Sequence, residues 1–264
     1  MQDKFALSDT GRAADTRFIG RRILYYPCLS STMDAARQAA LAGVVEGTIV
    51  LAGEQTAGRG RLERGWLSPQ GCLAFSLILY PEAHFLSGLV MVAALAVAET
   101  VTFLSPVAAG IKWPNDVMLN GKKISGILVE AGQREDLRRY AVIGVGLNVN
   151  LDPVLYPEIG DSATSLSAEV GRELSTAVVL RILLARLERW YEAYIAGEPV
   201  IDAWRASLTT IGKEVQVLAG GVQYEGVAED VALDGALLLR LNSGQLCKMA
   251  AGDVTLKTPG VSAA

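Results

Sequence analysis

Apolar runs separated by short polar or glycine-containing segments divide most of the chain into candidate strands and helices. Short apolar runs predict strands at 23–26, 48–53, 73–79, 116–119, 123–130 and 140–148. Longer stretches predict helices at 31–42, where Ser31 or Thr32 can cap the start and Gly43 the end, and at 85–103 and 175–208. The mixed order of the two types predicts an α+β fold, with a central mixed β-sheet covered by helices.

The pattern changes after about residue 210. Short strands then follow one another closely, at 214–218, 223–230, 236–241, 245–250 and 254–256. Turns such as Asn242-Ser243-Gly244 separate them, and this spacing predicts a small SH3-like β-barrel of about fifty residues. We therefore divide the chain into a flexible polar leader, a main domain, the barrel domain and a tail, over residues 1–20, 21–208, 209–258 and 259–264.

Composition narrows the class of protein. Of the 264 residues, 51% are apolar and 20% are charged, which suits one large soluble domain with a small appendage. The net charge of −4 and the pI of about 5.2 argue against a general nucleic-acid binder. Three widely spaced cysteines and the absence of an apolar signal-peptide core favour a reducing compartment, the cytoplasm. The longest apolar stretch, 85–98, is too short for a membrane span and is expected to be a buried helix.

The most distinctive chemistry lies in residues 58–66, GRGRLERGW, which contain three arginines, three glycines and a tryptophan. Glycines allow the backbone to approach a ligand closely, and guanidinium groups suit phosphate and carboxylate oxygens. The segment follows the strand at 48–53, so we expect a loop that closes over a small anionic ligand. A solvated basic surface loop is the alternative.

Three further segments place polar groups beside strands. In KWPNDV, at 112–117, Pro114 predicts a rigid turn that presents Asn115 and Asp116 side by side. KKISGILVE follows at 122–130, and GVGLNVN at 144–150 is a glycine-punctuated strand with a polar end.

Two details of the strand at 123–130 concern its geometry. Asn120-Gly121, just ahead of it, is the strongest hairpin signal in the chain. Strict alternation puts Lys123 and Ser125 on one face of the strand and Ile124 on the other.

Taken together and in this order, the GRGR…R.W segment, KWPND, the lysine-containing strand and GVGLNVN resemble the catalytic domain of biotin protein ligases. The match runs from about residue 23 to residue 150, and the small C-terminal β domain also fits. The resemblance implies a fold of the class II synthetase-like, biotin–lipoate ligase type. It also implies an AMP-forming ligase that condenses biotin and ATP, with Mg²⁺, to biotinyl-5′-adenylate. The biotinyl group then passes to one lysine of a biotin carboxyl carrier protein or domain.

The same resemblance implies the partners. Relatives that carry an additional N-terminal DNA-binding domain act as repressors, but too few residues precede the first strand here to form one. We therefore expect neither a nucleic-acid nor a membrane partner. Some relatives dimerise through sheet edges and others are monomers, so a homodimer is one of two expected states.

The resemblance also implies a role for each matching residue. Catalytic roles fall to Lys123, Arg59 and Asp116. Biotin is expected to contact Ser31, Thr32, Met33, Gln55, Gly58, Arg59, Gly60, Arg61, Lys123, Gly126 and Leu128. The nucleotide is expected to contact Arg61, Arg64, Trp66, Asn115, Asp116, Lys123, Asn148 and Lys257. In the family the counterpart of Lys123 lies between the biotin carboxylate and the α-phosphate, where a cation offsets two anions. No protein ligand is assigned to the metal.

The chain departs from the family pattern at two places. Leu62 and Glu63 stand where some relatives carry an arginine and a glycine, and Met33 stands where many carry a polar residue. The nearest rival function is a lipoate or octanoyl ligase, which shares the fold but not the GRGR and KWPND segments. A non-catalytic biotin-responsive regulator is a second alternative, which the retained Lys123 argues against. Nucleic-acid binding by the arginine segment is a third, which the acidic charge balance disfavours.

Overall fold

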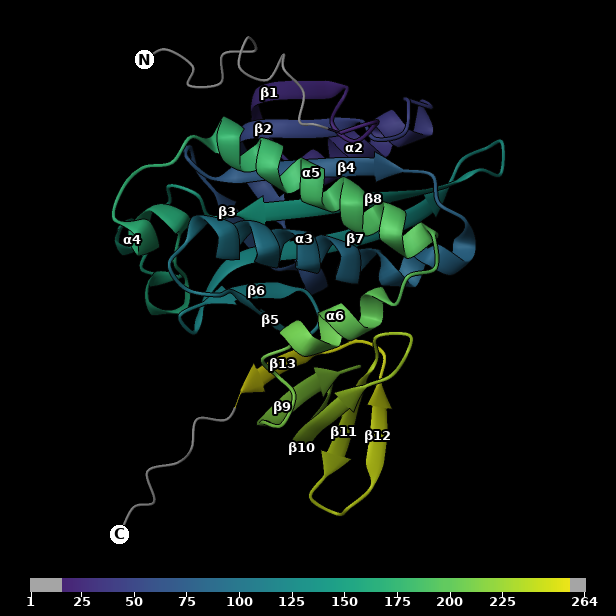
Figure 1. Ribbon diagram of the computed structural model, residues 1–264, viewed down its shortest axis with the longest axis vertical. Helices are drawn as coiled ribbons and strands as arrows, with labels where there is room; N and C mark the ends of the chain where they lie inside the picture. Colours follow the sequence, from purple (N-terminus) through teal and green to yellow (C-terminus); the bar gives the residue numbers. More distant parts are fainter. Residues whose placement is uncertain (1–15, 257–264) are drawn as a thin grey trace.

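The larger part of the molecule is built on one mixed β-sheet of eight strands (Figure 1). The computed structural model describes residues 16–256. Strand order is β1-β2-β4-β8-β7-β6-β5, with β3 paired to β2 off this path. The β1–β2 pair is parallel and the other pairs are antiparallel, which confirms the predicted mixed sheet. The strands are Ile23–Leu29 (β1), Ile49–Arg59 (β2), Gly65–Ser68 (β3), Leu73–Leu79 (β4), Gly110–Lys112 (β5), Asp116–Leu119 (β6), Lys122–Gln133 (β7) and Arg139–Leu147 (β8).

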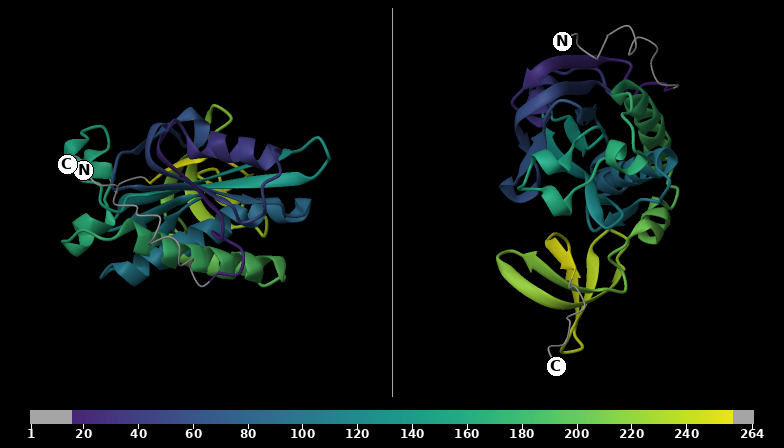
Figure 2. Two further views of the ribbon diagram at one scale, coloured as in Figure 1. Left: turned by 90° about the horizontal axis from the view of Figure 1, so that it is seen from above. Right: turned by 90° about the vertical axis from the view of Figure 1, so that its left-hand side faces the viewer.

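Helices cover both faces of this sheet (Figure 2). The α-helices are Thr32–Leu41 (α2), Leu89–Leu104 (α3), Leu166–Val170 (α4), Thr176–Ile195 (α5) and Val200–Ser207 (α6). Short 3₁₀ turns are Arg61–Glu63 (η1), Ala83–Gly88 (η2), Pro153–Leu155 (η3) and Gly160–Ser162 (η4). Successive side chains of β2 point to opposite faces of the sheet and so enter two hydrophobic cores. Val50 packs with α2, whereas Ile49 and Leu51 belong to the larger core with α3 and α5.

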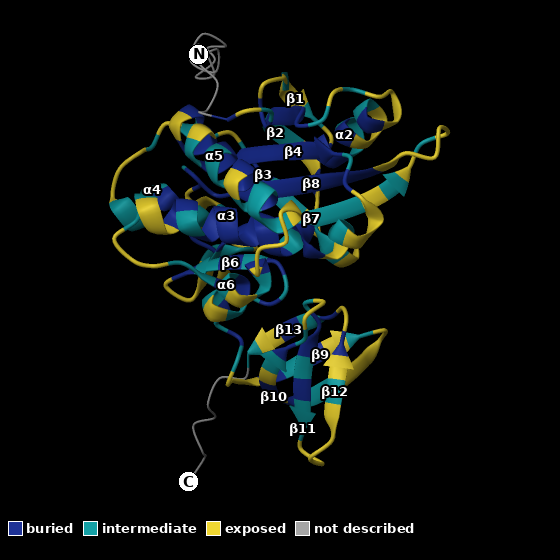
Figure 3. Cartoon of the chain, turned by 45° about the vertical axis from the view of Figure 1, so that its right-hand side comes forward, coloured by how far each residue is buried: buried dark blue, intermediate teal, exposed yellow. Residues whose placement is uncertain are grey.

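The central strands and α3 form the most buried part of the fold (Figure 3). By length and composition, Ala83–Leu104 could cross a membrane, but 67% of its most apolar window is buried inside the protein. The segment is therefore a core helix of this fold, as its sequence predicted.

A second, antiparallel sheet follows α6 (Figure 1). Its strands are Glu214–Ala219 (β9), Val222–Val231 (β10), Leu237–Leu241 (β11), Leu246–Met249 (β12) and Asp253–Leu256 (β13). They pair in the order β12-β11-β10-β9-β13, and among the described residues no pairing of β12 with β13 closes the sheet into a barrel. Trp113 joins the two sheets: its backbone N–H donates to Thr210 Oγ1 at 2.9 Å, and its indole Nε1 donates to the Gly235 carbonyl at 2.9 Å.

Two sequence predictions are wrong in detail. The helix expected over 175–208 is two helices, because Gly197 adopts a φ of 83° after α5 and Pro199 is the N-cap residue of α6. Residues 16–20 do not belong to a flexible leader. Ile19 is fully buried, and the backbone N–H groups of residues 17–19 donate to the carboxylate of Glu188 on α5. These bonds satisfy a carboxylate that is itself buried.

Candidate active site

A cavity lies where β7 and β8 meet the start of α2 and the hairpin formed by β2, η1 and β3. Thirteen of the residues predicted to act on a ligand line it, although they come from distant parts of the chain. They are Thr32, Met33, Gln55, Arg59, Gly60, Arg61, Arg64, Trp66, Asn115, Asp116, Lys123, Gly126 and Leu128.

Glycines form the floor of this cavity because large side chains lie directly on the sheet. A Cβ on Gly146 would come within 2.3 Å of Trp66 Cε2, and a Cβ on Gly144 would come within 2.5 Å of Met33 Sδ. A Cβ on Gly126 would lie 3.2 Å from Trp66 Cζ3. The floor therefore excludes side chains at these positions, and Trp66 and Met33 determine its shape.

Lys123 reaches the cavity through a β-bulge. Asp116 and Val117 pair with Gly126 and Ser125, but Met118 pairs with Lys123, so the register skips Ile124. The extra residue reverses the alternation that we expected. Lys123 consequently shares the cavity face with Gly126, whereas Ser125 is fully buried and donates to the Gly146 carbonyl at 2.6 Å.

The Lys123 ammonium lies beside a carboxylate and an aromatic ring. Its Nζ is 2.7 Å from Asp116 Oδ1 and 5.4 Å from the centroid of the Trp66 ring. The lysine side chain keeps 36% of its surface exposed, so its cation is accessible from the cavity. Because Asp116 and Lys123 neutralise each other, an incoming anion can bind Lys123 only by sharing or replacing this carboxylate.

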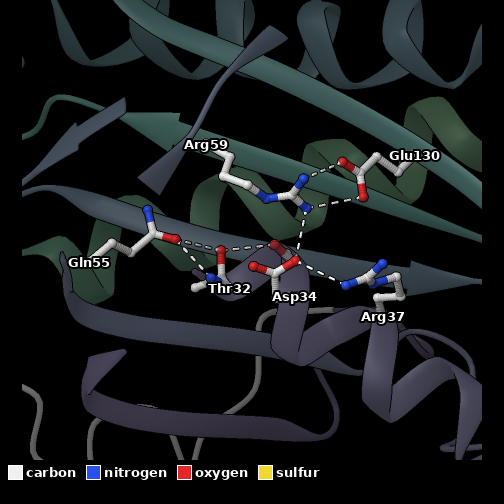
Figure 4. Close-up of polar contacts among 7 residues, drawn as sticks. Thr32, Asp34, Arg37, Gln55, Arg59 and Glu130 are labelled. Atoms are coloured by element: carbon white, nitrogen blue, oxygen red, sulfur yellow. Dashed lines mark hydrogen bonds and ion pairs between the residues drawn. The ribbon is translucent and has the colours of Figure 1, made fainter. Parts of the chain in front are cut away.

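The end of the cavity near α2 is a neutral hydrogen-bond network (Figure 4). Gln55 Oε1 accepts from the Thr32 backbone N–H at 2.8 Å and from Thr32 Oγ1 at 3.0 Å. Ser76 Oγ, fully buried, donates to Thr32 Oγ1 at 2.9 Å. The side chain of Ser31 does not cap α2 as we expected: its Oγ is buried with no partner in the protein. A buried hydroxyl of this kind is available to a polar ligand group.

The basic segment is a β-hairpin and not a loop, because β2 continues to Arg59 and pairs through Gly58 and Arg59 with Trp66 and Gly65 of β3. A Cβ on Gly58 would come within 2.4 Å of the Trp66 carbonyl oxygen, so glycine permits this close pairing. At the turn, Leu62 adopts a φ of 53°, which is unusual for a residue other than glycine.

Arg59 is paired with two carboxylates on other elements (Figure 4). Its Nη1 is 3.0 Å from Glu130 Oε1, its Nη2 donates to Glu130 Oε2 at 3.2 Å, and Nη2 is 3.1 Å from Asp34 Oδ1. The Arg59–Glu130 contact is thus bidentate, the strongest common geometry for this pair of groups. It joins the end of β2 to β7, and Asp34 joins it to α2.

The other two arginines of the hairpin contact the C-terminal sheet. Arg61 Nη1 donates to Asn115 Oδ1 at 2.9 Å and Nη2 to the Gly252 carbonyl at 3.1 Å, and Arg64 forms an ion pair with Asp253. Burial lowers the pKa of the Arg61 guanidinium, an effect that the carboxylates of Asp253 and Asp116 partly oppose. A partly desolvated cation of this kind gains from a further anion, so this end of the cavity favours phosphate.

Three predicted contacts lie elsewhere. Asn148 does not line the cavity: its Nδ2 donates to the Thr164 carbonyl at 2.9 Å, which fits a structural role. Ser31 and Gly58 are not among the residues that line the cavity, although each is next to one that is or pairs with one. Lys257 lies outside the described residues.

Several residues of the site were missed in the sequence. Asp34, Ser76 and Asp253 contact the hairpin or the neutral network but carry no local motif. Glu130 ends the KKISGILVE segment, but we gave it no role there. Gly144 and Gly146 lie in a segment that we singled out, and their spacing of two was the available signal for one strand face.

Comparison with known proteins gives two family matches. Residues 25–148 match the biotin/lipoate A/B protein ligase family, and residues 210–257 match the biotin protein ligase C-terminal domain. The biotin--[acetyl-CoA-carboxylase] ligase of Mycobacterium tuberculosis is 36% identical over 238 residues, 85% of each chain. The bifunctional ligase/repressor BirA of Bacillus subtilis is 35% identical over 259 residues, 96% of this chain and 79% of that protein.

Solved structures agree. The biotin protein ligase of Aquifex aeolicus in complex with biotin and ATP superposes with a TM-score of 0.78 at 28% identity. The alignment covers 90% of this chain and 99% of that one.

Proposed function

This chain belongs to the biotin/lipoate A/B protein ligase family, and we propose that it activates biotin with ATP to biotinyl-5′-AMP and transfers the biotinyl group to a lysine of a biotin carboxyl carrier protein. The observation that carries the proposal is one cavity with two unlike ends. A neutral hydrogen-bond network lies at one end, and Lys123 with Arg61 and Arg64 lies at the other. This polarity matches a substrate with an uncharged polar head and a carboxylate that must meet a phosphate.

The neutral end fits the ureido head of biotin. That head carries N–H donors and a carbonyl acceptor but no charge, so it needs neutral partners in a buried site. Gln55, Thr32 and the unpartnered Ser31 hydroxyl supply such groups. The glycine floor and Trp66 supply the apolar surface for the rest of the molecule.

Adenylation brings two anions together. A carboxylate oxygen of biotin bonds to the α-phosphorus of ATP as pyrophosphate leaves, and negative charge builds on the phosphoryl oxygens. Lys123 is the cation that we assign to the point between the carboxylate and the α-phosphate. Arg61 and Arg64 are assigned to the phosphates, for which they would exchange their present oxygens on Asn115, Gly252 and Asp253.

Transfer poses a separate chemical problem, because a free lysine has a pKa of about 10.4 and is mostly protonated at neutral pH. The acceptor amine must lose a proton as it bonds to the carbonyl carbon and AMP leaves. Asp116 is the group that we assign to this step, since it is a carboxylate in the cavity wall beside Lys123.

The remaining parts of the proposal concern the metal, the acceptor and the compartment. Among residues 16–256, no three His, Cys, Asp or Glu side chains are grouped to hold a metal ion, so we propose that Mg²⁺ arrives with the ATP phosphates. The names of the relatives favour a carboxylase carrier as acceptor. The three cysteines are unpaired, which favours the cytoplasm. A homodimer stays a prediction, for which sedimentation at several concentrations is the test.

Pyrophosphate release tests the proposal. The purified chain, ATP and Mg²⁺ are mixed with biotin or with lipoate, and labelling of a biotin carboxyl carrier domain is followed in parallel. We expect biotin-dependent release and covalent labelling. No release with biotin, or release with lipoate alone, would contradict the assignment.

A further inference from the structure

We propose that Glu130 and Asp34 are positioning residues that hold Arg59, fasten the hairpin over the cavity and so slow the escape of biotin and biotinyl-adenylate. We name this group of three residues the carboxylate clamp. The inference rests on the proposed function. It names the carboxylates through which Arg59, which we expected both to be catalytic and to order this segment, positions the hairpin.

The contacts of Arg59 support this assignment. Both terminal nitrogens of its guanidinium contact the two oxygens of Glu130, and Nη2 also contacts Asp34 (Figure 4). Glu130 and Asp34 occupy three of the five N–H donors of this guanidinium and offset its charge, so it attracts a phosphate less strongly. Arg61, by contrast, contacts only neutral oxygens of Asn115 and Gly252, which a phosphate can replace more easily.

The place of Arg59 in the hairpin explains what the clamp controls. Arg59 is the last residue of β2, and its partner Gly65 is the first residue of β3. The turn between them contains Gly60 and Leu62, and the Leu62 side chain is 63% exposed, so it supplies little apolar anchorage. Arg61 and Arg64 hold one side of the hairpin to the C-terminal sheet. The contacts of Arg59 with α2 and β7 hold the other side.

The ion pairs of the clamp are weak enough for the hairpin to open when a ligand enters or leaves. The side chains of Arg59, Glu130 and Asp34 are 38%, 33% and 43% exposed, so solvent screens their attraction. The ureido head of biotin is uncharged and does not compete for these charges. The clamp can therefore reform over bound biotin.

The test compares Glu130→Gln, Asp34→Asn and the double variant with a matched control. Glu229→Gln removes a bidentate carboxylate from Arg240, at 2.7 and 3.1 Å and with similar exposure, on the C-terminal sheet away from the cavity. The measurements are the biotin Kd by calorimetry without ATP, the KM for biotin and kcat by pyrophosphate release, and the rate at which adenylate leaves the enzyme. Thermal unfolding of each variant is measured alongside.

We expect Glu130→Gln to raise the biotin Kd and KM about threefold to fivefold and to speed adenylate release similarly, with little change in kcat. The wild-type biotin Kd should rise with salt more steeply than that of Glu130→Gln, because the clamp is ionic. Glu229→Gln should show neither effect, even where its thermal stability falls as much.

Two results would overturn the clamp: a fall in kcat with unchanged biotin Kd and release rate, or equal changes in the Glu229→Gln control. The calorimetric Kd needs no turnover. Failure of the clamp is therefore distinguishable from failure of the ligase assignment, which would leave the wild type without pyrophosphate release.

Discussion

The two ends of the cavity are built in different ways. At the neutral end, Gln55, Thr32 and Ser76 are joined by hydrogen bonds, and Ser76 and Thr32 are almost completely buried. At the charged end, Lys123 and Arg64 form ion pairs with Asp116 and Asp253, and their side chains are 36% and 63% exposed. One end is neutral and buried, and the other is charged and partly exposed.

This difference has an energetic meaning. Leaving one buried polar group of the neutral network without a partner costs about 1–3 kcal/mol, so the network selects strongly for a complementary head group. Exposed ion pairs contribute about 0–1 kcal/mol each, so their carboxylates can be exchanged for phosphate oxygens at little cost. The neutral end thus suits recognition of one small molecule, and the charged end suits charges that change during a reaction.

The first prediction concerns Asp116, at the charged end. Asp116→Asn keeps the shape of the side chain but removes the proposed proton acceptor, so transfer should slow about a hundredfold while adenylation changes much less. Single-turnover transfer from preformed adenylate to a carrier domain measures the first rate, and the pyrophosphate burst measures the second. Equal losses in both steps would show that Asp116 has no specific role in transfer.

A second prediction concerns the floor between the two ends. In Gly146→Ala the new Cβ would lie only 2.3 Å from Trp66 Cε2, so Trp66 must move. The free energy of unfolding should therefore fall by about 1–3 kcal/mol. Urea unfolding measures the loss, and biotin affinity should fall with it. Gly160→Ala is the control, because a Cβ there meets nothing within 4 Å. If both variants were equally stable, the packing of Trp66 against Gly146 would make no contribution to the stability of the protein.

A third, smaller effect isolates the neutral end. Thr32→Val keeps the shape but removes the hydroxyl that links Gln55 and Ser76, so the KM for biotin should rise about fivefold, with the KM for ATP unchanged. Thr48→Val is the matched control, since Thr48 is equally buried and its hydroxyl donates only to the Val45 carbonyl at 2.6 Å. A parallel rise in both KM values would mean that the two ends of the cavity are not independent.

The last prediction does not concern catalysis. It compares the reactivity of a buried thiol with that of an exposed thiol. Burial raises the pKa of Cys72, just ahead of β4, to about 12. The folded protein therefore keeps this group as the unreactive thiol at pH 8, where the exposed Cys28 should react with iodoacetamide. Peptide mass spectrometry before and after unfolding measures this, and modification of Cys72 in the folded protein would show that the interior opens.

The parts of the fold with strong local signals could be predicted from the sequence. The strand at 73–79 has the predicted bounds, and Asn120 and Gly121 have the positive φ values of 50° and 76° that a tight hairpin requires. The register skip at Ile124 could not be predicted, because it depends on how β7 pairs with β6. The partners of the hairpin arginines were missed for the same reason: Glu130 and Asp253 are 71 and 189 residues away from the arginines that they contact.

The most direct test of the charged end is the rate of biotin-dependent pyrophosphate release for Lys123→Ala beside Lys122→Ala. The two lysines are neighbours at the start of β7, but Lys122 is exposed and does not line the cavity, whereas Lys123 reaches it through the bulge. We expect Lys123→Ala to lower kcat about a hundredfold to a thousandfold and Lys122→Ala to stay within about twofold of the wild type. Equal rates in the two variants would contradict the role that we propose for Lys123 between the carboxylate and the α-phosphate.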